Sequence, residues 1–167
     1  MGRWSSLLAL LVATAATADA CEPADSLMQL PETQIVLENA AGTRHNITVR
    51  VAADLEARAT GFQGVCPDVV REMAILFIFP RQYFGNFHMH NVLAPLDIAF
   101  ADERGKVLAV KTMALYQPGQ TSPTYEPGGP FVYALEAAAG RLRMLLGGSH
   151  GGRLLVPQGA QRAPKVL

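Results

Sequence analysis

Two histidines separated by one residue, His88 and His90, form the pattern in this sequence that points most directly to chemistry. Alternate side chains share a face on a β-strand, so a strand here would place both imidazoles on one side. Neutral imidazole binds zinc, copper or nickel, and a stable transition-metal site needs more than two ligands. The candidates for a third ligand are His45, Asp97, Met113, Glu136 and His150. The alternatives are that both histidines are exposed to solvent, or that they titrate or contact a ligand.

Asp97 is the second candidate, because it lies among apolar residues in the run from Pro95 to Phe100. Burial of an ionised carboxylate is costly unless the group is hydrogen-bonded or paired. One interpretation is structural, with Asp97 accepting hydrogen bonds from backbone N–H groups around the bend. The other is a binding or catalytic carboxylate that forms a polar pair with Asn91. Catalysis would need a second acid, a base or a nucleophile, and the sequence does not identify one.

The two cysteines of the chain, Cys21 and Cys66, bear on where the protein works. Arg3, a short apolar run and the small-x-small sequence Ala18-Asp19-Ala20 form the pattern of a signal peptide that is cleaved after residue 20. We therefore expect a periplasmic or secreted protein whose mature chain begins at Cys21. In an oxidising compartment the two cysteines can form a disulfide bond. A lipid anchor on Cys21 is the alternative, and the two exclude each other.

Composition excludes several classes of function. The chain has 14 basic and 14 acidic residues, so no broad field of one sign is expected to attract nucleic acid or an anionic membrane. Beyond the leader no apolar run approaches the roughly 20 residues of a transmembrane helix. The sequence also lacks a phosphate-binding glycine loop, a Gly-x-Ser-x-Gly motif and a His-Glu-x-x-His motif.

The elements that would position these groups are mostly strands. Runs of β-branched and aromatic residues predict strands over 34–39, 46–51, 73–79, 106–113, 131–136 and 153–156. The run 73–79 is apolar throughout, which favours a central strand covered on both faces. A change of period predicts a helix within 53–64 that is capped by Asp54 and has Leu55, Ala59 and Phe62 on one stripe. Further short helices are expected over 69–72 and 137–146.

The domain organisation follows from these elements. We expect a signal peptide over 1–20, an irregular mature N-terminus over 21–33, a single β-rich domain over 34–157 and a flexible tail over 158–167. A long loop rich in proline and glycine spans 116–130. Such loops are usually functional or mobile, so its polar and aromatic side chains either roof a site or pack the crossing; they are Tyr116, Tyr125 and Glu126.

Several ordered motifs resemble the family known as domain of unknown function 192. They are Ala59-Thr60-Gly61-Phe62, the run 73–80, Phe87-His88-Met89-His90-Asn91, the run 95–100, Gly105 and the run 133–140. The resemblance covers about residues 34–157. It implies a compact, mainly β, barrel-like domain with a few short helices, often exported and without an established activity.

The resemblance also selects residues. Phe87, Met89, Asn91, Asp97 and Glu136 match the family pattern, whereas the two histidines stand where the family usually has tryptophan and lysine. Any role of that lysine charge is therefore in doubt for this chain.

Two hypotheses about function follow. The first is a non-catalytic exported module of the bacterial cell envelope that binds a small ligand or another envelope protein, with no resident cofactor. Its site is a cleft beside the family-matching residues Phe87, Met89, Asn91, Asp97 and Glu136. The alternative is a metal-binding protein or an enzyme of unknown reaction, centred on Asp97 with His88 and His90.

Overall fold

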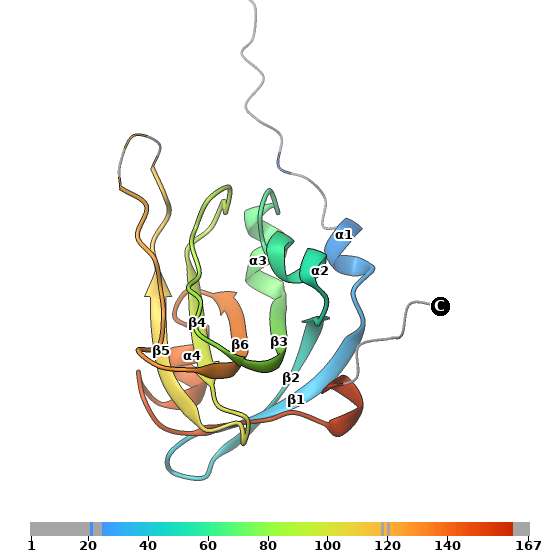
Figure 1. Ribbon diagram of the computed structural model, residues 1–167, viewed down its shortest axis with the longest axis vertical. Coiled ribbons are helices and arrows are strands. Elements are labelled where there is room, and N and C mark those ends of the chain that lie inside the picture. Colours follow the sequence, from blue (N-terminus) through green and yellow to red (C-terminus); the bar gives the residue numbers. More distant parts are fainter. Residues whose placement is uncertain (1–20, 22–24, 118, 120, 162–167) are drawn as a thin grey trace, which may run out of the picture.

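A computed structural model describes residues 21, 25–117, 119 and 121–161. The predicted signal peptide and the last residues of the predicted tail, 162–167, lie outside the described residues. Figure 1 shows the elements in chain order, which are α1 (Asp25–Met28), β1 (Glu32–Glu38), β2 (Arg44–Ala52), α2 (Leu55–Thr60), α3 (Pro67–Glu72), β3 (Ala74–Tyr83), β4 (Leu96–Ala101), β5 (Val107–Met113), β6 (Phe131–Ala138), α4 (Arg141–Leu146), β7 (Arg153–Leu155) and a 3₁₀ turn, η1 (Gln158–Gln161). The segment 21–33, expected to be irregular, thus holds the short helix α1.

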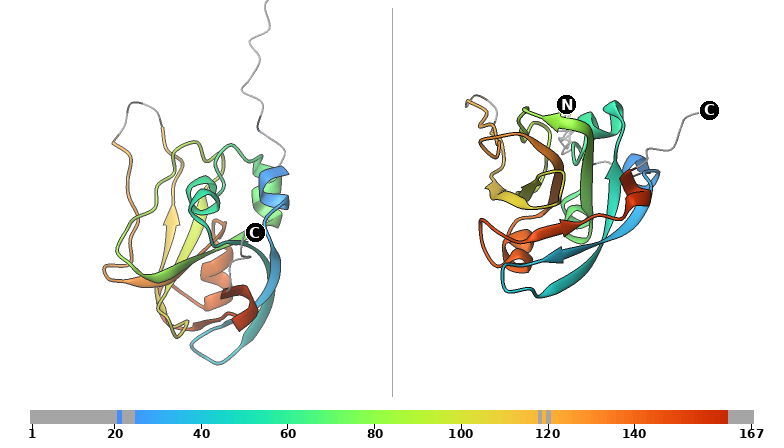
Figure 2. Two further views of the ribbon diagram at one scale, coloured as in Figure 1. Left: turned by 45° about the vertical axis from the view of Figure 1, so that its right-hand side comes forward. Right: turned by 60° about the horizontal axis from the view of Figure 1, so that its bottom comes forward.

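The strands form one curled sheet in the order β5-β4-β6-β3-β2-β1-β7. Strands β2 and β3 pair in parallel, and the other neighbours are antiparallel. The right-hand view of Figure 2 shows how far the sheet curls. Its two ends meet at an isolated bridge between Lys106 and Arg153 and at a 2.7 Å hydrogen bond from Leu154 N–H to the Gly105 carbonyl. The prediction of a mainly β, barrel-like single domain with a few short helices is confirmed, in the form of a half-barrel.

Gly105 is required where the sheet ends meet. Its φ is +75°, a conformation that L side chains rarely adopt, and an added Cβ would overlap the carbonyl oxygen of Leu154. The turn before it is held by Asp102, whose Oδ1 accepts from the N–H groups of Arg104 and Lys106, at 2.9 Å each. The hairpin between β4 and β5 therefore closes with a turn that also contacts β7.

The sheet separates two hydrophobic clusters, because successive side chains of a strand point to opposite faces. The first core lies on the face covered by α1, α2 and α3, and the second core lies on the face covered by α4. On β3, for example, Ile75 and Phe77 enter the first core, and Leu76 and Ile78 enter the second. The predicted central strand is thus confirmed, since it is buried on both faces from Ala74 to Ile78.

Helix α2 is shorter than predicted and presents a different face. Its cap is as expected, with Asp54 Oδ1 accepting from Ala57 N–H at 2.8 Å. The predicted stripe is wrong for Leu55, which is 79% exposed, and for Ala59, which is exposed, whereas Phe62 is buried as predicted. Ala57 is the residue of the helix that is buried. The helix ends at Thr60, and Phe62 follows Gly61 outside it, so helical periodicity does not set the direction of the Phe62 ring.

The helix predicted over 137–146 begins later, at Arg141. Ala137 and Ala138 continue β6 because they pair with Asp97 and Leu96 of β4. Pairing within the sheet overrides the helix propensity of alanine here. Strand β6 therefore extends past Glu136, which sits inside the sheet and not at its end.

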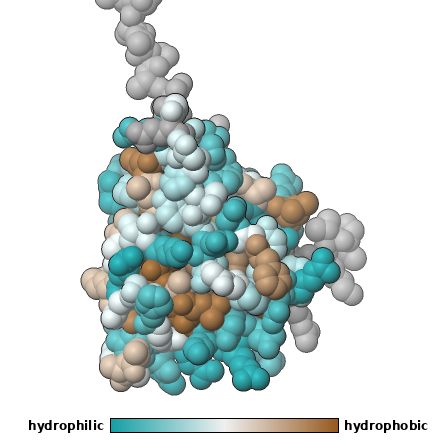
Figure 3. Space-filling view, turned by 60° about the vertical axis from the view of Figure 1, so that its left-hand side comes forward, coloured by the Kyte–Doolittle hydropathy of each residue, from teal (hydrophilic) through white to brown (hydrophobic). Residues whose placement is uncertain are grey.

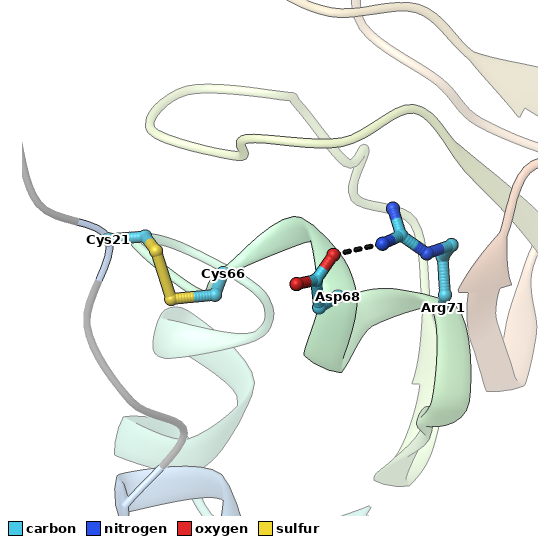
Figure 4. The surroundings of a disulfide bond; sticks show 4 residues. All are labelled: Cys21, Cys66, Asp68 and Arg71. Carbon is cyan, nitrogen blue, oxygen red and sulfur yellow. Dashed lines mark hydrogen bonds and ion pairs between the residues drawn. A yellow bond between two sulfur atoms is a disulfide. The ribbon is translucent and has the colours of Figure 1, made fainter.

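A disulfide joins Cys21 to Cys66 at the start of α3, as Figure 4 shows. It ties residue 21 to the loop between α2 and α3, beside the ion pair of Asp68 with Arg71 on α3. The prediction of a disulfide is confirmed. A thiol in this bond cannot carry a lipid in the same molecule, so the bond excludes the lipid-anchor alternative for the oxidised protein.

None of the helices in the described part of the chain has both the length and the apolar character needed to span a membrane. On the face seen in Figure 3, hydrophobic side chains gather in small groups between hydrophilic ones.

Candidate functional site

A cleft of about 460 Å³ opens on the face of the sheet that carries the first core. That volume lies within the range of about 300–1,000 Å³ found for small-molecule sites. Its walls come from α2 and the loop after it, from the second half of β3 and from the segment 86–92 between β3 and β4. The lining residues include Arg58, Gly61, Phe62, Gln63, Phe77, Phe79, Arg81, Tyr83, Asn86, Phe87, His88 and Glu136.

Glu136 is the acid of this cleft. Strand β6 carries it at mid-length, opposite Ile75 of β3 and Ile98 of β4, so hydrophobic neighbours surround it on both sides. Its side chain is only 4% exposed, and no hydrogen bond or ion pair to it is found among the described residues. Burial removes water from the charged form and raises the pKa of this carboxyl to about 8. At neutral pH Glu136 is therefore mainly protonated.

Gly61 lets the backbone pass close to this acid. A Cβ on Gly61 would lie 3.8 Å from Glu136 Oε2 and 3.4 Å from Phe77 Cζ. The residue also has a φ of +51°, which favours glycine. The motif Ala59-Thr60-Gly61-Phe62 thus places a glycine of positive φ beside the buried carboxyl, where an added Cβ would be in ordinary contact with it.

Aromatic rings form much of the cleft wall. Phe87 packs edge to face against Phe77 with ring centroids 5.2 Å apart, and Phe79 stacks on Tyr83 at 4.4 Å. Such pairs are favourable beyond the area that they bury, and they hold the rings in fixed orientations. The cleft therefore offers a preformed apolar and aromatic surface beside a single acid.

Two arginines line the cleft in different states. The Arg58 guanidinium donates to the carbonyls of Ala53 and Ile78 and lies 5.2 Å from the centroid of the Phe79 ring. It is therefore held against the wall. Arg81 is exposed at the outer half of β3, and the described residues offer it no hydrogen bond or ion pair.

Asp97 lies on the opposite face of the sheet, with the second core. It is fully buried, and its Oδ1 accepts from Thr112 Oγ1 at 2.7 Å. Its Oδ2 accepts from the N–H groups of Leu142 and Arg143 at 3.1 and 3.2 Å. These are the unpaired donors of the first turn of α4, whose own N-cap, Gly140, has no side chain to bond them. Asp97 is thus an N-cap supplied by a neighbouring strand.

The segment that carries the two histidines is not a strand. Between β3 and β4 the backbone makes only isolated bridges, from Phe87 to Tyr125 and from Val92 to Gln63. The rings of His88 and His90 are 5.0 Å apart, and His90 packs on Tyr116 at 4.5 Å. The strand that the prediction assumed is therefore not formed, because this segment lacks a continuous partner strand, although the two rings lie close together.

The structure does not complete the predicted metal site. Within residues 21, 25–117, 119 and 121–161, no group of three His, Cys, Asp or Glu side chains is arranged to hold a metal ion. Asp97 is bonded to α4 on the other face of the sheet, while His88 lines the cleft. The alternative centre of Asp97 with His88 and His90 is therefore not brought together.

Of the five family-matching residues, two line the cleft and three do not. Phe87 and Glu136 line the cleft. Met89 is fully buried in the first core, and Asn91 is an exposed turn residue with a φ of 58° whose carbonyl accepts from Gly64 N–H at 2.7 Å. With Asp97 bonded to α4, the predicted convergence of all five is wrong.

The long loop packs against the same region. Tyr125 exchanges two backbone hydrogen bonds of 2.9 Å with Phe87, and its hydroxyl accepts from Ala114 N–H at 3.2 Å. Tyr116 contacts His90. Tyr125 thus supports the wall that carries Phe87, whereas Glu126 is exposed and outside the cleft lining.

The cleft residues that sequence reasoning missed are Arg58, Gly61, Phe77, Phe79 and Arg81. One signal could have found two of them. Phe77 and Phe79 occupy alternate positions of the apolar run, and strand periodicity places them on one face. No comparable signal joins α2 to β3, because that contact depends on tertiary packing.

Comparisons with known proteins agree with this fold. No relative among the curated proteins matches this chain. The crystal structure of a protein from Sinorhizobium meliloti 1021, described provisionally as a transcription regulator, is similar with a TM-score of 0.63 and 26% identity over 75% of this chain and 93% of that chain. A protein of unknown function from Novosphingobium aromaticivorans DSM 12444 has the same fold, with a TM-score of 0.65 and 23% identity over 87% of this chain and 100% of that chain.

The family model covers most of the domain, including the cleft. The model of domain of unknown function 192, described as Uncharacterized ACR, matches residues 22–149, a span that contains every strand from β1 to β6, all four α-helices and the cleft. The chain therefore belongs to the family of domain of unknown function 192.

Proposed function

We propose that this protein is an exported, non-catalytic binding domain of the bacterial cell envelope that holds a small ligand in the Glu136 cleft. The observation that carries the proposal is a carboxyl that is 4% exposed, lines a cleft of about 460 Å³ and has no partner among the described residues. Among the described residues only Ser122 Oγ is a fully buried side-chain polar atom without a partner, so the Glu136 oxygens are open to the cleft, where a ligand can bond them.

Binding accounts for this geometry better than catalysis does. A single carboxyl needs a second acid, base or nucleophile within hydrogen-bond reach to carry out acid–base or covalent chemistry. No described residue bonds the Glu136 carboxyl, and the other buried acid, Asp97, caps α4 on the opposite face. The cleft instead combines a preformed aromatic wall with a few polar side chains and a single acid, which is the composition of a binding site.

Export is supported by two independent observations. The first is the leader pattern over residues 1–20. The second is the disulfide between Cys21 and Cys66, because such bonds persist in oxidising compartments. Both observations support a periplasmic or secreted location.

Nucleic acid is a poor candidate for the partner, although a similar protein carries a provisional description as a transcription regulator. The chain has equal numbers of basic and acidic residues, and phosphate contacts need a local excess of basic groups. An envelope protein is the better second candidate. Leu55 and Phe84, at or next to the cleft lining, are 79% and 75% exposed.

The proposal is tested on protein that is exported by its own leader and purified without denaturation. Native mass spectrometry should show a small molecule that is lost on denaturation, and the intact mass should correspond to a chain that begins at Cys21. The variant Ala59→Trp, at an exposed position of the cleft lining, should abolish the adduct. Ala41→Trp, in the exposed turn between β1 and β2, is the matched control and should retain it.

Two results would overturn the proposal. An adduct that persists in Ala59→Trp would place the ligand elsewhere. Retention of residues 1–20 by the chain recovered from the envelope fraction, or its recovery only from the cytoplasm, would remove export.

A further inference from the structure

The unpaired acid of the cleft restricts the chemistry of its ligand. An apolar ligand without polar groups would leave the Glu136 carboxyl without a partner, at a cost that buried polar groups rarely bear. An anion would gain at most one hydrogen bond from the protonated carboxyl and would oppose its ionisation. A cation with N–H donors satisfies the carboxylate oxygens and compensates their charge.

We infer, resting on the proposed function, that the ligand is an organic amine whose ammonium group pairs with Glu136 and whose apolar body lies against the phenylalanine wall of the cleft. The Glu136 side chain is 4% exposed, has no partner among the described residues and lines the same cleft as Phe77 and Phe87. Aromatic faces also attract cations through the negative face of the ring quadrupole.

The other basic side chains of the cleft do not prevent an ammonium group from pairing with Glu136. Arg58 from α2 is engaged by two backbone carbonyls and by the Phe79 ring. Arg81 from β3 and His88 from the segment 86–92 are exposed. The two exposed groups lie in solvent, where their repulsion of an ammonium ion is screened. Glu136 is the only acid in the cleft lining, so it is the one group there that can neutralise a buried cation.

Binding of an amine must release a proton. In the free protein Glu136 is protonated, because burial raises its pKa to about 8. The ion pair forms when the carboxylic acid gives its proton to solvent and the carboxylate accepts hydrogen bonds from the ammonium group. At pH 7 about nine-tenths of the carboxyl is protonated, so about 0.9 proton leaves for each ammonium ion bound.

The probe pair is phenethylammonium chloride and 2-phenylethanol, which share a carbon skeleton and differ in charge. Isothermal titration calorimetry at pH 7, in two buffers of different ionisation enthalpy, measures affinity and proton release together. We expect the ammonium probe to bind at least about tenfold more tightly than the alcohol, with release of about 0.9 proton. Its affinity should rise about tenfold per pH unit below the pKa of Glu136.

Three variants test whether Glu136 causes the preference for the ammonium probe and the proton release. Glu136→Gln should lose both the preference for the ammonium probe and the proton release. Glu103→Gln, the same substitution in the exposed turn between β4 and β5, should retain both. His88→Asn should retain the proton release, which separates the effect of Glu136 from that of the histidine in the lining. If Glu136→Gln fails to fold, proton release by the unaltered protein decides alone.

The outcomes separate this inference from the proposed function. Equal affinity for both probes without proton release overturns the amine assignment, while loss of that binding in Ala59→Trp would uphold the cleft as a ligand site. Binding of neither probe at millimolar concentration also overturns the amine assignment. In that case the co-purified adduct and its loss in Ala59→Trp still decide whether the cleft binds a ligand.

Discussion

The buried acid of the cleft makes the stability of this protein depend on pH in an unusual direction. Most buried carboxylates are paired, so they stabilise a fold above their pKa and lose this contribution in acid. Glu136 has no partner, and burial raises its pKa from 4.5 to about 8. Between those two values the folded chain holds more protons than the unfolded chain. The contribution of Glu136 to the free energy of unfolding therefore falls as the pH rises.

The perturbation that isolates this effect is Glu136→Gln, which retains the shape and removes the titration. A pKa difference between 4.5 and about 8 corresponds to about 3–4 kcal/mol of stability lost between pH 5 and pH 8, at about 1.36 kcal/mol per unit. Relative to the variant, the unaltered protein should therefore lose about that amount over this range. Glu103→Gln, in an exposed turn, should follow the unaltered protein.

Urea unfolding of the mature chain at pH 5, 6, 7 and 8, followed by circular dichroism, measures this difference. The only tryptophan of the sequence is Trp4 in the predicted leader, so its fluorescence is no probe of the mature chain. Parallel curves of stability against pH, with a constant offset between the unaltered protein and Glu136→Gln, would refute the reasoning. If the unaltered protein instead lost stability relative to Glu136→Gln as the pH fell, the carboxylate would be paired in the folded state, and this result would refute the reasoning as well.

Two further predictions concern stability. Asp97→Asn should lower the free energy of unfolding by about 1–3 kcal/mol, because the N–H groups of Leu142 and Arg143 lose a charged acceptor, yet leave affinity for a cleft ligand unchanged. Urea unfolding and calorimetry with a cleft probe check the two parts, and an altered affinity would contradict the placement of Asp97. The double change Cys21→Ser, Cys66→Ser should remove about 4 kcal/mol, since the disulfide closes a loop with a sequence separation of 45. Thermal and urea unfolding measure the loss, and unchanged stability would mean that residue 21 is ordered without the bond.

Strand content was predictable wherever one segment carries its own signal. The run 73–79 is apolar without interruption, and the structure buries it on both faces. The turn at 102–105 combines an Asx acceptor with a glycine of positive φ, which local chemistry alone specifies. These elements need no knowledge of their neighbours.

The candidate site could not be predicted from the sequence, because it depends on the register between neighbouring strands. Asp97 pairs with Ala137, and Ile98 pairs with Glu136, so the two acids point to opposite faces of the sheet. A shift of one residue would have placed them together, and nothing in either segment alone fixes that shift. The histidine segment failed for a related reason, since strand periodicity applies only where a partner strand exists.

Strand β6 has hydrophobic packing residues on one face and the acid of the cleft on the other. Every second position, with Leu135 and Ala137, packs into the interior that α4 covers, while Glu136 between them faces the cleft. A substitution at position 136 would therefore change the chemistry of the cleft without disturbing the hydrophobic layer behind the strand.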